Sequence, residues 1–260
     1  MPFYLLRVAA TIAGLVVLLL IIIFLVCGRK GMMYLLALAA AVAVIMTVIV
    51  PLLARGYDPT LIVFLAALPI IALMVYAAEG YTELSNLSIL AIVVSFAATS
   101  ILADIAVKLA GFSGIVSDTS LIVGGERGLD LVKLLTSGIM LGALGGIIEM
   151  SVTQVATVIK LDALDPNAAS AQIRAHANSI GVAHLGAVIS TMFLLYSGAS
   201  LSLLIVFSSP GTGAGNLLGY EPLTSEVVRI LVGLIGTMLA MPIATFFAVR
   251  RVKKSRRPAC

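Results

Sequence analysis

A single carboxylate, Glu149, lies near the middle of the apolar stretch Leu134–Leu161, which is long enough to cross a lipid bilayer. An ionised carboxylate at that depth is costly, so Glu149 should face the protein interior and be either protonated or paired. Two interpretations stay open. Glu149 is either a neutral acid that hydrogen-bonds to a Ser or Thr of a neighbouring helix, or a proton or cation relay that changes state during transport.

Four glycines share a helix face with this acid. At about 100° per residue, they and Glu149 fall within one arc of roughly 100° on a helical wheel. A face of small residues lets a second helix approach closely, so this face is predicted to be a helix-packing surface. The four glycines are Gly138, Gly142, Gly145 and Gly146.

The following apolar stretch supplies the candidate partners of Glu149. Counted from the predicted cytoplasmic ends of the two stretches, Ser190 and Thr191 lie closer to the depth of Glu149 than His184 does. We therefore expect Ser190 or Thr191 to bond to the acid. His184 is either the cytoplasmic step of a water-connected proton path or an interfacial polar residue.

The composition explains why these residues must work inside a membrane. The chain has 260 residues, of which 61% are hydrophobic and only 11% charged, and its mean hydropathy is +1.19. An ordinary soluble domain is about half apolar and about a quarter charged. The apolar runs lack the alternation of strands, which predicts an all-α, polytopic transmembrane helical bundle rather than a barrel.

About seven spans fit this length, as one transmembrane domain over residues 1–260. The predicted spans cover residues 8–26, 32–53, 60–78, 84–110, 134–159, 182–207 and 227–249, and a basic tail follows at 250–260.

The basic tail sets the predicted orientation. Because positive charge collects on the cytoplasmic side, the C-terminus is expected in the cytoplasm and the N-terminus outside. The Glu79–Glu83 loop then lies inside without a positive charge of its own. A specific anionic-lipid site is the sharper interpretation of the tail, and nucleic acid is not expected because no aromatic residues interleave with the charges. The basic residues are Arg250, Arg251, Lys253, Lys254, Arg256 and Arg257.

Enzyme chemistry is not expected. The chain has no H-E-x-x-H, G-x-S-x-G or Walker A motif. Its two cysteines, Cys27 and Cys260, form neither a disulfide framework nor a metal-binding spacing. We predict no cofactor and no metal.

Five segments carry a family resemblance. They are G-R-K-G-M at Gly28–Met32, V-P-L-L-A-R-G-Y-D-P at Val50–Pro59, the glycine-rich Gly138–Thr153, Ser179–Leu201, and Gly233–Ile243. From Gly28 onward their order resembles the YibE/F-like family of bacterial and archaeal membrane proteins, of the short, YibF-like type. In that family Asp usually stands at Glu149, and the sixth span carries Arg, Asp, Thr and Asn at the positions held here by Val182, Ala183, Ala187 and Ser190.

The resemblance implies the plasma membrane of a prokaryote and a partner, either a second copy or a longer YibE/F-like paralogue. The arrangement also resembles, by analogy of fold alone, half of a resistance-nodulation-division or SecD/SecF-type membrane domain. Two function hypotheses follow. The chain is a transport component of undefined substrate, with proton coupling through Glu149, or it is a non-catalytic membrane subunit or assembly partner.

Overall fold

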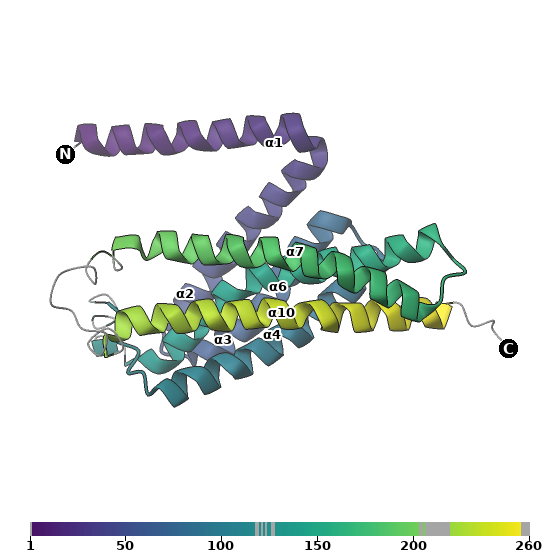
Figure 1. Cartoon of the computed structure of the whole chain (residues 1–260). Helices are drawn as coiled ribbons and strands as arrows, with labels where there is room; N and C mark the ends of the chain where they lie inside the picture. Colours follow the sequence, from purple (N-terminus) through teal and green to yellow (C-terminus); the bar gives the residue numbers. More distant parts are fainter. Residues whose placement is uncertain are drawn as a thin grey trace.

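The computed structural model describes residues 2–117, 120, 122, 124, 125, 128–202, 205 and 219–255. Within these residues the chain is helical and has no strand, which confirms the all-α class (Figure 1). The long helices after the first run lie roughly along one common direction and form a bundle. They are α3 (Pro59–Glu79), α4 (Glu83–Ala110), α6 (Leu131–Leu164), α7 (Ser170–Ala199) and α10 (Glu221–Ser255).

The chain begins with a long bent helical run. Helix α1 (Pro2–Val44) passes into a short π-helix and then α2 (Val50–Ala54). Gly28 has φ 58° and ψ −143°, a conformation open to glycine but unfavourable for other residues, and the helix turns there. The arm before this bend leaves the bundle in Figure 1, and its side chains are almost all exposed.

Helix α6 is the centre of the bundle, because it contacts α3, α4, α7 and α10. One side of α6 is apolar and completely buried, as expected for a helix surrounded by others. Its fully buried side chains include Ile139, Met140, Ile147 and Met150. This packing holds Glu149, on the same helix, in a defined position.

Short polar residues cap the starts of three bundle helices, and a glycine ends one of them. Asp58, Thr82 and Asp130 each accept a hydrogen bond from a first-turn backbone N–H, at the starts of α3, α4 and α6 respectively. Such caps satisfy backbone donors that the helix itself leaves free. Gly111, with φ 66°, ends α4 in the left-handed conformation that glycine adopts without strain.

Ion pairs join the helices at both ends of the bundle. At one end, which we call the basic end, Glu83 of α4 pairs with Arg251 of α10. At the opposite end, Asp58 before α3 pairs with Lys133 of α6, with Oδ2 and Nζ 2.5 Å apart. The Glu79–Glu83 loop, which has no positive charge of its own, therefore receives one from the C-terminal helix.

The helices differ from the predicted spans at two places. The predicted spans 8–26 and 32–53 belong to one helical run of 52 residues, Phe3–Ala54, so the described residues contain six helices long and apolar enough to cross a membrane. Helix α7 begins at Ser170, well before the predicted start at 182, and ends at Ala199. Part of the predicted span end near 207 lies outside the described residues.

Helices α4 and α10 approach closely at Gly236. A Cβ atom added there would lie 2.5 Å from Thr99 Oγ1 and 2.7 Å from Thr99 Cγ2. Thr99 is β-branched, completely buried and bonded to its own helix through Ser95 O. It therefore cannot turn aside, and the two helices need glycine at this contact.

We predict that Gly236→Ala destabilises the bundle by about 1–3 kcal/mol, because the added methyl group forces α4 and α10 apart. The matched control is Gly186→Ala on α7, where an added Cβ meets nothing within 4 Å. Thermal unfolding of the detergent-solubilised monomer measures both variants. Equal melting temperatures for the two variants would contradict the close contact.

Candidate functional site

Glu149 and His184 face each other across α6 and α7. Glu149 Oε1 lies 3.7 Å from His184 Nε2, which is within ion-pair range but longer than a hydrogen bond. The Glu149 side chain is 55% exposed and that of His184 is 30% exposed. The imidazole Nε2 is itself buried and has no hydrogen-bond partner in the structure. The pair therefore lies at the surface of this single chain, with its imidazole partly enclosed.

The two residues also lie at the same depth. Glu149 is fifteen residues before the end of α6 at Leu164, and His184 is fourteen residues after the start of α7 at Ser170. At about 1.5 Å per residue, both lie roughly 21–22 Å along their helices from the basic end. This places an acid and an imidazole together near the middle of a bilayer about 30 Å thick.

Among the described residues, no hydrogen bond joins Glu149 to either of its predicted partners, Ser190 and Thr191. Their hydroxyls donate to carbonyls of their own helix, Ser190 to Gly186 O at 2.9 Å and Thr191 to Ala187 O at 3.0 Å. Both residues are exposed. The depth count began at the end of the polar linker, whereas α7 already begins inside that linker.

Two of the glycines beside Glu149 leave space for side chains of neighbouring helices. A Cβ atom on Gly146 would lie 2.5 Å from Thr237 Oγ1 and 2.6 Å from Met192 Sδ, so Gly146 admits α10 and α7. A Cβ atom on Gly142 would lie 2.7 Å from Tyr196 Oη of α7.

The remaining two glycines have more room. A Cβ atom on Gly138 would come no closer than 3.4 Å to the Arg229 guanidinium of α10, and one on Gly145 would meet nothing within 4 Å. Three of the four glycines thus contact neighbouring helices of the same chain. Gly145, one helical turn from Glu149, faces open space.

A buried amide links α6, α7 and α10 between Glu149 and the basic end. Gln154 is 1% exposed, and its Nε2 donates to Ala177 O at 3.0 Å and to Thr245 Oγ1 at 2.8 Å. Thr245 Oγ1 in turn lies 3.4 Å from Asn178 Oδ1. Gln154 Oε1 is buried without a partner. Such an acceptor is costly, so it marks a place where a proton donor or water is stabilised.

Gln154 was missed in the sequence. It is an uncharged amide five positions after Glu149 in the same apolar stretch, so it has no charge to mark it there. A glutamine in a membrane span needs partners as much as an acid does, and this is the signal that could have revealed it.

Polar groups continue toward the opposite end along the same helices. Tyr196 of α7 lies over Gly142, and Arg229 of α10 lies over Gly138. Arg229 Nε is 3.3 Å from Glu226 Oε1. We call this succession of groups along α6, α7 and α10 the polar seam. Its members are Glu226, Arg229, Tyr196, Glu149, His184, Gln154, Thr245 and Asn178.

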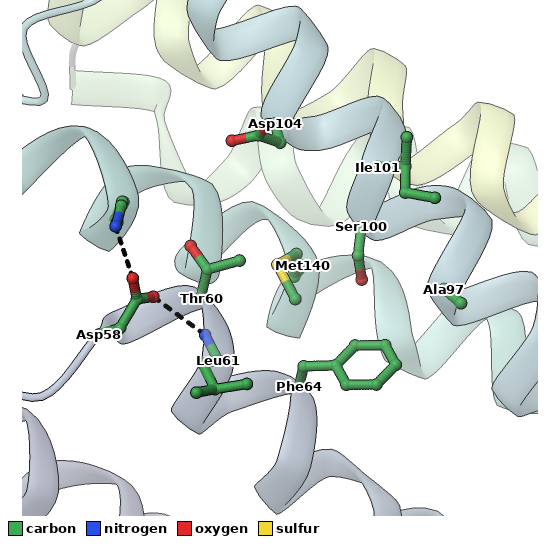
Figure 2. Close-up of a pocket in the computed structure, with 10 residues that line it drawn as sticks. Asp58, Thr60, Leu61, Phe64, Ala97, Ser100, Ile101, Asp104 and Met140 are labelled. Carbon is green, nitrogen blue, oxygen red and sulfur yellow. Dashed lines mark hydrogen bonds and ion pairs between the residues drawn. The ribbon is translucent and has the colours of Figure 1, made fainter.

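A separate cavity opens between α3, α4 and α6 at the opposite end (Figure 2). Its volume is about 580 Å³, and its mouth carries Asp58, Asp104 and Lys133. Figure 2 shows the Asp58 carboxylate bonded on two sides, which are the ammonium of Lys133 and the backbone N–H of Leu61. The walls are apolar, formed by Leu61, Phe64, Ala97, Ile101 and Met140. Such a slot suits an amphipathic molecule with a charged head.

The charges at this cavity are largely paired within the chain. The hydrogen bond from Lys133 is the main reason why the pKa of Asp58 is lowered from its ordinary value of 3.8. Asp104 pairs with Lys108 of its own helix at 2.6 Å. Thr60 Oγ1 is buried and has no hydrogen-bond partner, so it is the free polar group of the pocket.

The described side chains of the predicted basic tail have different neighbours. Arg251 pairs with Glu83, while the Arg250 guanidinium lies 5.9 Å from the centre of the Phe246 ring. Lys253 is exposed on α10. Lys254 belongs to α10 by its backbone, and Arg256 and Arg257 lie outside the described residues. Within the described part of the chain no group of three or more His, Cys, Asp or Glu residues could hold a metal ion.

Comparison with known proteins gives one match. The model of a family described as YibE/F-like protein matches residues 15–254. No curated protein and no solved structure matches the chain.

We predict that Asp58→Asn weakens the bundle at neutral pH by less than about 1 kcal/mol, because Asn keeps the helix cap but loses a partly exposed ion pair. A lowered pKa in the folded state means that this stabilisation is present above pH 3.8 and is lost as the pH falls through the folded-state value. The melting temperatures of wild type and variant should therefore converge in acid. A Lys133→Gln variant should behave similarly, and the double variant should lose no more than either single one. A gap that widens in acid would contradict the ion pair.

Proposed function

The chain belongs to the YibE/F-like protein family, and we propose that it acts as a membrane transport component whose protonatable group is Glu149. The Glu149–His184 pair carries this proposal. A carboxylate and an imidazole 3.7 Å apart can exchange a proton without moving their helices, because rotation of either side chain brings them into hydrogen-bond contact.

Their position in the membrane supports a change of state. An ion pair at this depth is expensive, and so is an isolated carboxylate. A proton that moves between Glu149 and His184 converts the charged pair into a neutral one at little structural cost. The net charge of the pair is zero in both of these states. Coupling to a proton gradient therefore also requires the pair to take up a proton from one side of the membrane and release it to the other.

The polar seam supports a route to and from this pair. Gln154, Thr245 and Asn178 continue the hydrogen-bonding groups from Glu149 toward the basic end. On the other side, Tyr196 and Arg229 continue them toward the opposite end. All these residues belong to the three helices α6, α7 and α10, so small shifts among these helices would open or close the route.

We further propose that a second copy of the chain covers the Glu149 face. A half-exposed carboxylate at mid-depth would meet lipid in a single copy, and the membrane disfavours this. The surface around it allows close approach, since added Cβ atoms on Gly145 of α6 and Gly186 of α7 would meet nothing within 4 Å. In a two-fold dimer Glu149 of each copy faces the same surface of the other, where His184 supplies a complementary charge.

The proposal also includes the number of membrane crossings and the orientation of the chain. The run Phe3–Ala54 is long enough for two crossings that meet at Gly28, which gives seven in total. The basic end then lies in the cytoplasm of a prokaryotic plasma membrane, and the N-terminus lies outside. With two copies paired across α6 and α7, the assembly would correspond to the two halves of a resistance-nodulation-division or SecD/SecF-type membrane domain.

A second candidate function is a non-catalytic subunit or assembly partner of a longer YibE/F-like paralogue. The observation that favours it is the open Gly145–Glu149 surface, which can hold a partner helix without any proton transfer. On this account the acid only orients the partner. The two functions therefore make different predictions for an uncharged residue at position 149. The relay would lose proton transfer, whereas the assembly role would change little.

The relay predicts that Glu149→Gln reduces the rate of proton flux by about tenfold or more, because Gln keeps the shape of the side chain but cannot ionise. Proteoliposomes with an imposed membrane potential and an internal pH-sensitive dye measure proton flux, and the stress phenotype of a deletion strain measures function in cells. Asp104→Asn is the matched control, since this acid lies outside the seam and pairs with Lys108. Full activity of a stably inserted Glu149→Gln protein would exclude the relay and leave the assembly function.

The dimer predicts a disulfide cross-link through Gly145→Cys in a Cys27→Ser/Cys260→Ser background. Ile101→Cys is the control, because Ile101 lies at nearly the same depth on α4 and is 63% exposed. Oxidation in native membranes should link Gly145→Cys into dimers at least several-fold more than Ile101→Cys. Equal cross-linking would contradict a second copy on this face. Gly142 is unsuitable for the test, since its side of α6 is already occupied by Tyr196.

A further inference from the structure

A second cavity, of about 570 Å³, lies at the basic end between the first turns of α7 and the last turns of α10. Asn178, the deepest residue of α7 that lines it, is eight residues after the helix start at Ser170, or roughly 12 Å along the helix. The cavity therefore spans the depth at which lipid headgroups meet the acyl chains. Its lining residues are Ser170, Ala171, Arg174, Ala175, Asn178, Phe246, Val249, Arg250 and Lys253.

Three cations converge on this cavity from two helices. Arg174 comes from α7, and Arg250 and Lys253 come from α10. None of the described residues that line the cavity is acidic. Arg251, one position away on α10, instead lines a different cavity together with its partner Glu83. The described residues that line this cavity thus include three basic side chains and no carboxylate, which favours an anionic ligand.

Neutral donors complete the polar part of the cavity. Ser170 and Ala171 form the first turn of α7, a helix of 30 residues, where backbone N–H groups and the helix dipole favour an anion. At the inner end, Asn178 uses its Oδ1 with Thr245, at 3.4 Å, which leaves its amide NH₂ able to donate to a ligand.

The inner wall is apolar. Phe246, Val249 and Ala175 line it, and the Arg250 guanidinium stacks 5.9 Å from the centre of the Phe246 ring. Guanidinium groups that lie over an aromatic ring keep their N–H donors free at the edges for a phosphate. A charged mouth above an apolar wall matches a molecule that has both an anionic head and hydrocarbon chains.

We propose that this cavity is a binding site for an anionic phospholipid of the leaflet at the basic end. The phosphate would lie among Arg174, Arg250 and Lys253, and the glycerol backbone and upper chains would lie against Phe246 and Val249. Three positive charges favour a headgroup with two phosphates, of the cardiolipin type, over one with a single phosphate. The site does not depend on the transport function proposed for Glu149.

This assignment also distinguishes individual basic residues of the tail, which a general attraction to the membrane does not. Residues 250 and 253 are three apart and share a helix face, whereas residue 251 is turned by about 100°. The tail therefore carries one face for a lipid and another for the ion pair with Glu83. Asn178, which lines the inner end of the cavity, lies 3.4 Å from Thr245, the hydrogen-bond partner of Gln154.

The test uses the full-length chain, delipidated in mild detergent and titrated with cardiolipin, phosphatidylglycerol or phosphatidylcholine. Native mass spectrometry counts bound lipids. The variant is Arg174→Gln/Arg250→Gln/Lys253→Gln, and all three positions are exposed, so the bundle should stay folded. The control, Arg29→Gln/Lys30→Gln/Lys160→Gln, removes the same charge from exposed positions outside the cavity.

Wild type and control should bind cardiolipin saturably and more tightly than phosphatidylcholine, and the cavity variant should bind it at least about tenfold more weakly. Equal binding by wild type and cavity variant would overturn the site. Equal weakening in both variants would also overturn it, because that result indicates general electrostatic attraction. Displacement of the lipid by inorganic phosphate at the same phosphorus concentration would assign the cavity to free phosphate and overturn the lipid.

If the triple variant fails to fold, Arg174→Gln alone decides the question, since Arg174 is an exposed residue that forms no ion pair in the described structure. It should weaken cardiolipin binding several-fold, and Arg174→Lys should restore part of it. Binding by Arg174→Gln that equals wild type would contradict the proposal.

Discussion

An ionisable side chain at mid-depth in a bilayer must be neutral, paired or covered, and the structure around Glu149 is organised by this constraint. The central helix α6 presents the acid beside His184 of α7, at the same distance from the basic end. The glycines before it allow α7 and α10 to approach where they are needed. Among the four glycines of α6 before the acid, Gly145 alone has nothing within 4 Å of an added Cβ atom, and it lies a single turn from Glu149. A surface suited to close packing thus also carries the ionisable group.

A second polar residue links the same three helices. Gln154 connects α6 to a carbonyl of α7 and to a hydroxyl of α10. A glutamine with its donor fully used and its acceptor unused is an incomplete hydrogen-bonding unit, and such units are costly in a medium of low dielectric constant. Buried polar residues also occur on α4, where Ser95 and Thr99 donate to carbonyls of their own helix, whereas Gln154 joins three different helices.

Charges outside the membrane interior fix the ends of the bundle. Glu83 with Arg251 joins α4 to α10 at the basic end, and Asp58 with Lys133 joins the start of α3 to the start of α6 at the other. Each of these pairs is partly exposed and contributes little free energy by itself. Their effect is to set which helix ends lie together. That arrangement in turn places Arg250 and Lys253 of α10 against the first turns of α7.

Much of this protein follows from its sequence alone. Composition determines a helical membrane bundle, because so much apolar surface cannot be buried in a soluble core. The motifs indicated the family, and the family match confirms it. The acid at mid-depth is also visible, since a helix rises by a constant 1.5 Å per residue.

The partner of the acid does not follow from the sequence, because depth must be counted from the true end of each helix. Helix α7 begins at Ser170 within a polar linker, a position that hydropathy does not mark, so the sequence favoured Ser190 and Thr191 over His184. Packing between segments far apart in the chain brings Gln154 to Thr245 and brings Arg174 and Arg250 to one cavity, and only the tertiary structure decides this.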